Sequence, residues 1–76
     1  MRVRDLGSNY SVSVSEREVD AFNRKWPCST LRGRYTFEFE KRSGDLVDMT
    51  GSGDGSEHVA LSQDAQEYGK RKLGIK

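Results

Sequence analysis

The chain has 76 residues, with 13 lysines and arginines against 12 aspartates and glutamates, for a net charge of +1. One cysteine and one histidine exclude an internal disulfide and a Cys/His zinc site, and the near-zero charge excludes a polycation or an acidic nucleic-acid mimic. We predict one small domain, residues 1–76, without a metal or cofactor. The unpaired cysteine and the lack of a signal-like or membrane-length apolar run predict a cytoplasmic protein with no membrane association.

The chain starts with a segment that has no clear periodicity, so we expect residues 1–7 to be loose. The next segment, "NYSVSV" over residues 9–14, alternates strictly between apolar and polar side chains. Tyr10, Val12 and Val14 would point to one face and the intervening polar residues to the other. This pattern predicts a half-buried strand.

A helix is predicted over residues 15–26. Ser15 and Glu18 have the spacing of a capping box, in which each side chain satisfies a backbone N–H of the first turn. Pro27 disfavours helical geometry at the residue before it, so the helix should end there. One apolar stripe would face the core, formed by Val19, Phe22 and Trp26.

The segment "RYTFEFEKRSGDLVDMTG" predicts a β-hairpin, because aromatic and polar residues alternate before the turn. We prefer a three-residue loop that ends at Gly44, since it brings apolar residues into register: Phe37 opposite Met49, and Phe39 opposite Val47. Gly44 would then adopt the left-handed conformation of a G1 bulge.

A flexible Gly/Ser linker, residues 51–56, should lead into a second helix. That helix would run from about Ser56 to Leu73, with Ser62 as the alternative start. Its apolar stripe is partial, and consists of Leu61, Ala65 and Tyr68. Gly69 should weaken the helix and Gly74 can end it, which leaves residues 75–76 loose.

These elements predict an α+β fold in the order β-α-β-β-α, with a three-stranded antiparallel sheet and both helices packed on one face. The expected core consists of Tyr10, Val12, Val14, Val19, Phe22, Trp26, Tyr35, Phe37, Phe39, Val47, Met49, Leu61, Ala65 and Tyr68. The other face of the sheet would be polar and net acidic, and would carry Ser11, Ser13, Thr36, Glu38, Glu40 and Asp48.

The sequence offers little support for catalysis. Cys28 as a nucleophile would need a base, and His58 is the one histidine; no local nucleophile signature is present, so we expect Cys28 to fill space. "GSGDGS" lacks the lysine of a phosphate-binding loop and the third glycine of a dinucleotide loop. The acids between Asp45 and Glu57 do not have EF-hand spacing. We therefore predict a protein that is not an enzyme.

The basic segment "FNRKWPCSTLRGR", residues 22–34, is the candidate binding site. Arginine and tryptophan are common in interface hot spots, and an acidic stretch over residues 43–69 suggests faces of opposite charge. The residues that we expect to bind a protein partner are Arg24, Lys25, Trp26, Arg32 and Arg34. Trp26 could serve as an anchor or as part of the core.

Two other forms of binding stay open. The same basic segment, with the basic C-terminus "KRKLGIK", could bind nucleic acid through phosphate contacts and base stacking, provided that the aromatic rings are exposed. Alternatively, a homodimer could form through an exposed sheet edge, at the first strand or at the strand that contains Met49.

The pattern also resembles short proteins of bacteriophages and prophages that have no assigned activity. The resemblance is carried by Phe22, Asn23, Trp26, Pro27, Cys28, Ser29 and Leu31, then by Gly44 to Asp48, and then by Leu61 to Tyr68. It implies a bacterial cytoplasmic setting and an accessory protein that binds a host or phage protein. It implies no catalytic or binding residue.

Overall fold

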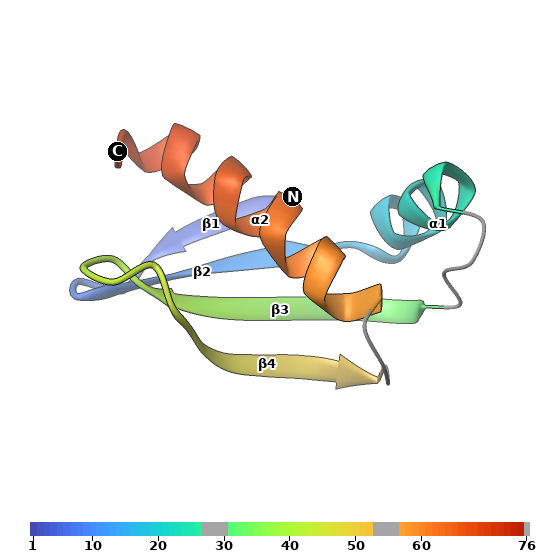
Figure 1. Ribbon diagram of the computed structural model, residues 1–76, viewed down its shortest axis with the longest axis horizontal. Coiled ribbons are helices and arrows are strands. Elements are labelled where there is room, and N and C mark those ends of the chain that lie inside the picture. Colours follow the sequence, from blue (N-terminus) through green and yellow to red (C-terminus); the bar gives the residue numbers. More distant parts are fainter. Residues whose placement is uncertain (27–30, 53–56, 76) are drawn as a thin grey trace.

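The computed structural model describes residues 1–26, 31–52 and 57–75, and it forms an α+β fold with one antiparallel sheet (Figure 1). The elements in chain order are β1 (Arg2–Asp5), β2 (Asn9–Val14), α1 (Glu16–Lys25), β3 (Arg32–Glu40), β4 (Leu46–Ser52) and α2 (Glu57–Leu73). The strand order in the sheet is β1-β2-β3-β4, and each neighbouring pair is antiparallel. The sheet thus has four strands where the sequence predicted three.

The additional strand is β1, which corrects the expectation that residues 1–7 are loose. It pairs along its full length with β2, with Val3 opposite Val12. A two-residue turn joins the two strands, since the Leu6 N–H donates to the Asn9 carbonyl at 2.9 Å and Gly7 has a φ of 92°. Only one of its four residues is apolar, so β1 lacks the alternation that identified the other strands.

Helix α1 is one residue shorter at each end than the predicted range of 15–26, with Ser15 as its N-cap and Trp26 as its C-cap. The capping box is confirmed: the Glu18 N–H donates to the Ser15 hydroxyl oxygen at 3.3 Å, and the Ser15 N–H donates to the Glu18 carboxylate at 3.1 Å. Val19 and Phe22 are buried as expected. The core placement of Trp26 is wrong, because this residue is the C-cap and already has extended backbone geometry, which takes the indole off the helical stripe.

The β3–β4 hairpin confirms part of the predicted register. Phe37 lies opposite Met49, and Gly44 has a φ of 78°, as the G1-type turn requires. However, Phe39 lies opposite Leu46 and not Val47, because the register shifts at this point. Val47 is the extra residue of a β-bulge, and its side chain is 49% exposed, so its assignment to the core is wrong.

Helix α2 begins by Glu57, which excludes Ser62 as its start; Ser56 lies outside the described residues. Gly74 ends the helix with a φ of 69°, and the Ile75 N–H donates to the Lys70 carbonyl at 2.9 Å. Ile75 packs against the core, so its predicted looseness is wrong, while Lys76 is not described. Of the predicted linker, Gly51 and Ser52 belong to β4 and residues 53–56 are not described.

One core cluster lies between the helices and the inner face of the sheet, so both helices pack on the same face, as predicted. Its buried members are Tyr10, Val12, Val14, Val19, Phe22, Leu31, Tyr35, Phe37, Phe39, Leu61 and Ala65. Leu31 was not expected, and Met49 and Tyr68 are partly buried against this cluster. The outer face carries the polar residues predicted for it, since Ser11, Glu38 and Asp48 form one cross-strand row.

Candidate interaction surfaces

The five residues that were predicted to bind a partner come from two elements, and two of them line different grooves. Arg24 and Lys25 are in the last turn of α1, and Trp26 caps that helix. Arg32 and Arg34 are in the first part of β3, after residues 27–30, which include Cys28 and lie outside the described part of the chain. Lys25 lines a groove between α1 and α2, whereas Arg34 lines a different groove.

Trp26 is the large hydrophobic side chain with the greatest exposure among the described residues, at 50%. Its backbone is fixed, because its N–H donates to the Phe22 carbonyl at 2.9 Å. Its indole lies 6.2 Å from the Phe22 ring, measured between centroids. Trp26 is therefore held in place on one side and open to solvent on the other, which agrees with the anchor role and not with the core role.

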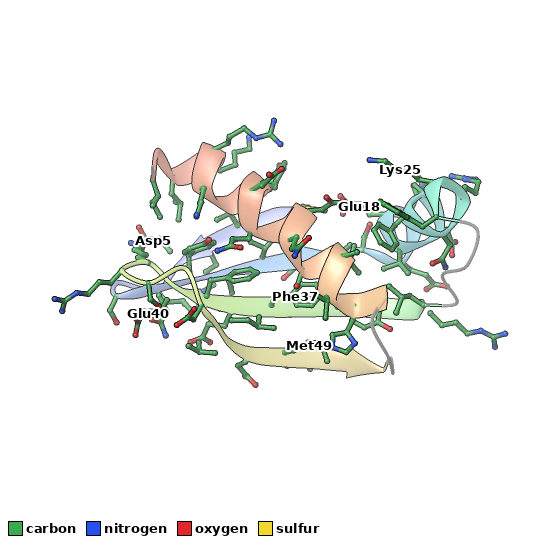
Figure 2. All side chains as sticks on the ribbon, viewed as in Figure 1. Asp5, Glu18, Lys25, Phe37, Glu40 and Met49 are labelled. Carbon is green, nitrogen blue, oxygen red and sulfur yellow. The ribbon has the colours of Figure 1, made fainter. Side chains whose placement is uncertain are left out.

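The groove between the helices is small and partly apolar. Its volume is about 270 Å³, and its floor includes Phe22 and Leu61. Three charged side chains line it: Glu18, Lys25 and Asp64. Figure 2 shows Lys25 on the side of α1 that points away from the sheet. A partner that contacts Lys25 would therefore approach α1 from the side opposite the sheet.

A wider groove, of about 760 Å³, lies where the start of α1 meets the outer face of the sheet. Three arginines from three elements line it: Arg2 of β1, Arg17 of α1 and Arg34 of β3. Three hydroxyl groups line it as well, those of Ser13, Ser15 and Thr36. We refer to these six residues as the arginine groove.

Strand register explains how the arginine groove is assembled. Arg2 pairs with Ser13, and Ser13 pairs with Thr36, so these three side chains form one row across the outer face. Arg34 precedes Thr36 by two residues and therefore shares its face. The Ser13 and Thr36 hydroxyl oxygens are 3.5 Å apart; Arg2 lies next to Ser13 in this row, and Arg34 lies two residues from Thr36 along β3.

Sequence reasoning found Arg34 and missed Arg2 and Arg17. The sequence does not indicate Arg2 because β1 lacks an alternating pattern, and it does not indicate Arg17 because this residue lies outside the basic segment, in the first turn of α1. The signal that could have found Arg2 is the Gly7-Ser8 pair, since a two-residue Gly-Ser loop is typical of a hairpin.

Two carboxylates also line the arginine groove. Glu18 accepts from the N-terminal ammonium of Met1 and from the backbone and hydroxyl of Ser15. Burial acts to raise the pKa of Glu18, but these hydrogen bonds together outweigh it, so the pKa lies below its usual value. The negative charge of Glu18 is thus already compensated, while Glu16 is exposed.

Three further observations concern polar side chains of the described residues. No group of three or more His, Cys, Asp or Glu residues in this part of the chain is placed to hold a metal ion. Among these residues the buried Tyr10 hydroxyl has no hydrogen-bond partner, and burial raises the pKa of this phenol. Asp5 accepts from Lys41 at 2.7 Å, and this hydrogen bond is the main reason why the pKa of Asp5 is lowered.

The basic C-terminus does not extend the basic end of α1. Figure 1 shows the C-terminal end of α2 and helix α1 near opposite ends of the longest dimension of the molecule, which is 33 Å. Lys72 lies over the Tyr68 ring, with its Nζ 5.8 Å from the centroid. No helix in the described residues is long and apolar enough to cross a membrane.

Comparison with known proteins yields no match: no family model, curated protein or solved structure is similar enough to the chain to count as one. A function for this chain must therefore be inferred from the surfaces described above.

Proposed function

We propose that this chain is a small non-enzymatic accessory protein of the bacteriophage type, which acts in the bacterial cytoplasm by binding a host or phage protein. The observation that supports this proposal most strongly is the half-exposed indole of Trp26, which basic residues precede in the last turn of α1. A tryptophan that the free protein already holds in place loses little conformational freedom on binding. Tryptophan and arginine are also the side chains that most often dominate the energy of an interface.

In this proposal Trp26 is the anchor and the cations around it form a polar rim. Arg24 and Lys25 lie next to it in the chain, and Arg32 begins the strand that follows. Arg34 was predicted as a member of the same site, but it lines the arginine groove instead. A partner with an apolar pocket bordered by acids would match this surface in shape and charge.

The test is to capture partners from a bacterial lysate with tagged protein, with and without nuclease. Trp26→Ala should abolish capture of a specific protein, and the pair Arg24→Glu with Lys25→Glu should weaken it strongly. Arg42→Glu is the matched control, because Arg42 is an exposed arginine of the β3–β4 loop. Capture that survives Trp26→Ala and the double charge reversal would refute the proposed site.

Nucleic-acid binding is the alternative, and the exposure of Trp26 favours it too, since an exposed indole can stack on a base. It predicts captured material that disappears after nuclease, and an affinity that falls steeply with salt. A partner that persists after nuclease and binds with little salt dependence would exclude it. Because α1 and the C-terminal basic turn lie near opposite ends of the molecule, a nucleic acid would have to span its longest dimension to contact both (Figure 1).

A further inference from the structure

We propose that the arginine groove binds the phosphate group of a small phosphorylated ligand of nucleotide size. This inference does not depend on the Trp26 surface. It rests on three guanidinium groups, contributed by separate elements, around a pair of hydroxyls on the open face of the sheet. The groove volume of about 760 Å³ lies in the range of small-molecule sites, roughly 300–1,000 Å³.

The arrangement of donors matches a phosphate. Guanidinium groups bind phosphate oxygens through two parallel N–H donors, and they keep their charge at any accessible pH. The Ser13 and Thr36 hydroxyls can rotate to donate outward, because their mutual contact is long, at 3.5 Å. A phosphate placed above these hydroxyls would have Arg2 beside Ser13 in the same cross-strand row and Arg34 two residues from Thr36 along β3, with Arg17 at the border formed by α1.

The electrostatics of the groove favour a dianion. The Glu18 carboxylate is held by the Met1 ammonium and by Ser15, so it does not compete for the three arginines. Glu16 does compete, since it is exposed and lines the same groove. After Glu16 is subtracted from the three arginines, the groove keeps an excess of positive charge that a phosphate dianion can neutralise and a single carboxylate of an acidic peptide cannot.

The groove favours a small ligand over a nucleic-acid strand. Tyr35 is the one aromatic residue among those that line it, and its ring is buried. Without an exposed ring the groove has no surface on which successive bases could stack, which is the usual basis of single-strand binding. Recognition would therefore depend on the phosphate.

The experiment is an NMR titration of the ¹⁵N-labelled full chain at constant ionic strength, with inorganic phosphate, AMP, adenosine and chloride. Phosphate and AMP should produce saturable shifts at the amides of Ser13, Thr36 and Arg34, and adenosine and chloride should not. Arg34→Gln and Arg17→Gln should each weaken binding by up to about fivefold, the factor that corresponds to about 1 kcal/mol for an exposed ion pair. Glu16→Gln should tighten binding, because it removes the competing carboxylate.

Arg42→Gln is the matched control and should leave the affinity unchanged. The proposal is overturned if Arg34→Gln behaves like Arg42→Gln, if adenosine binds as well as AMP, or if no saturation is reached. Shifts that chloride reproduces would indicate an adventitious ion only, which also overturns it. A short oligonucleotide that binds through the same arginines more tightly than AMP would overturn the small-ligand assignment. Native spectra of the variants would show that the fold is intact.

Discussion

Replacement of Gly69 by alanine should destabilise the protein, although alanine is the better helix former. A Cβ at this position would lie 2.5 Å from Cε2 of Tyr10 and 3.0 Å from Cγ2 of Val12. Both neighbours are fully buried, and the Tyr10 ring stacks on Phe39 with 5.3 Å between centroids. The ring therefore has little room to move away from the added methyl group.

The magnitude follows from two opposing terms. Alanine in a helix interior gains about 1 kcal/mol over glycine, whereas overpacking a core costs about 1–3 kcal/mol. Because 2.5 Å is far inside van der Waals contact, we expect the cost near the upper end of its range, and a net loss of about 1–2 kcal/mol. In a domain of this size such a loss lowers Tm by roughly 4–16 °C.

Urea denaturation and thermal melting of the Gly69→Ala chain would measure this loss. Gln63→Ala is a suitable control, since Gln63 is an exposed residue of the same helix, and it should change stability by less than about 0.5 kcal/mol. If Gly69→Ala is as stable as the parent chain or more stable, then α2 does not pack against Tyr10 as closely as described, and the reasoning is refuted.

Three further predictions concern the capping box of α1, the loss of stability at acidic pH and the β-bulge at Val47. Ser15→Ala should cost about 1 kcal/mol in urea denaturation, because it leaves an N–H of the first turn of α1 unsatisfied; no loss would mean that the capping box is not formed in solution. The lowered pKa of Glu18 means that its stabilising contribution is present above its ordinary pKa of 4.5 and is lost as the pH falls through its lower folded value. Glu18→Gln should flatten the fall in stability across that acidic range, and an unchanged profile would contradict the proposed hydrogen bonds. Val47→Ser at the exposed bulge should change the free energy of unfolding by less than about 0.5 kcal/mol, whereas Leu31→Ala in the core should cost about 2 kcal/mol or more. Equal losses at both positions would mean that Val47 is buried after all.

The elements with strong periodicity could be predicted from the sequence. The alternation of residues 9–14 identified β2, and the capping box with its apolar stripe identified α1. These patterns succeed because the period of a strand or helix decides which of its own side chains face the core. β1 was not predicted because backbone pairing with β2 holds it in the sheet, and backbone pairing leaves no pattern in the sequence. Val3 is the one apolar residue of β1.

The errors at Trp26 and Val47 have a common cause. Each residue continues the apolar pattern of its element, but it lies where the backbone departs from regular geometry, at a helix cap and at a bulge. A one-residue change in backbone geometry turns the side chain away from the core. The arginine groove was missed for a different reason, since three elements distant in the chain contribute to it.

The order of the strands in the sheet bears on how the chain folds. Each strand pairs with the next strand in the chain, so the two hairpins, β1–β2 and β3–β4, form from segments close in sequence. The remaining pairing, β2 with β3, closes a loop of residues 15–31 that contains α1. Such local topology keeps the entropy of loop closure small and is associated with fast folding in a single step. Apart from a slow phase from cis/trans isomerisation of the bond before Pro27, stopped-flow refolding should therefore follow one exponential. A populated intermediate would show that the hairpins form well before they join.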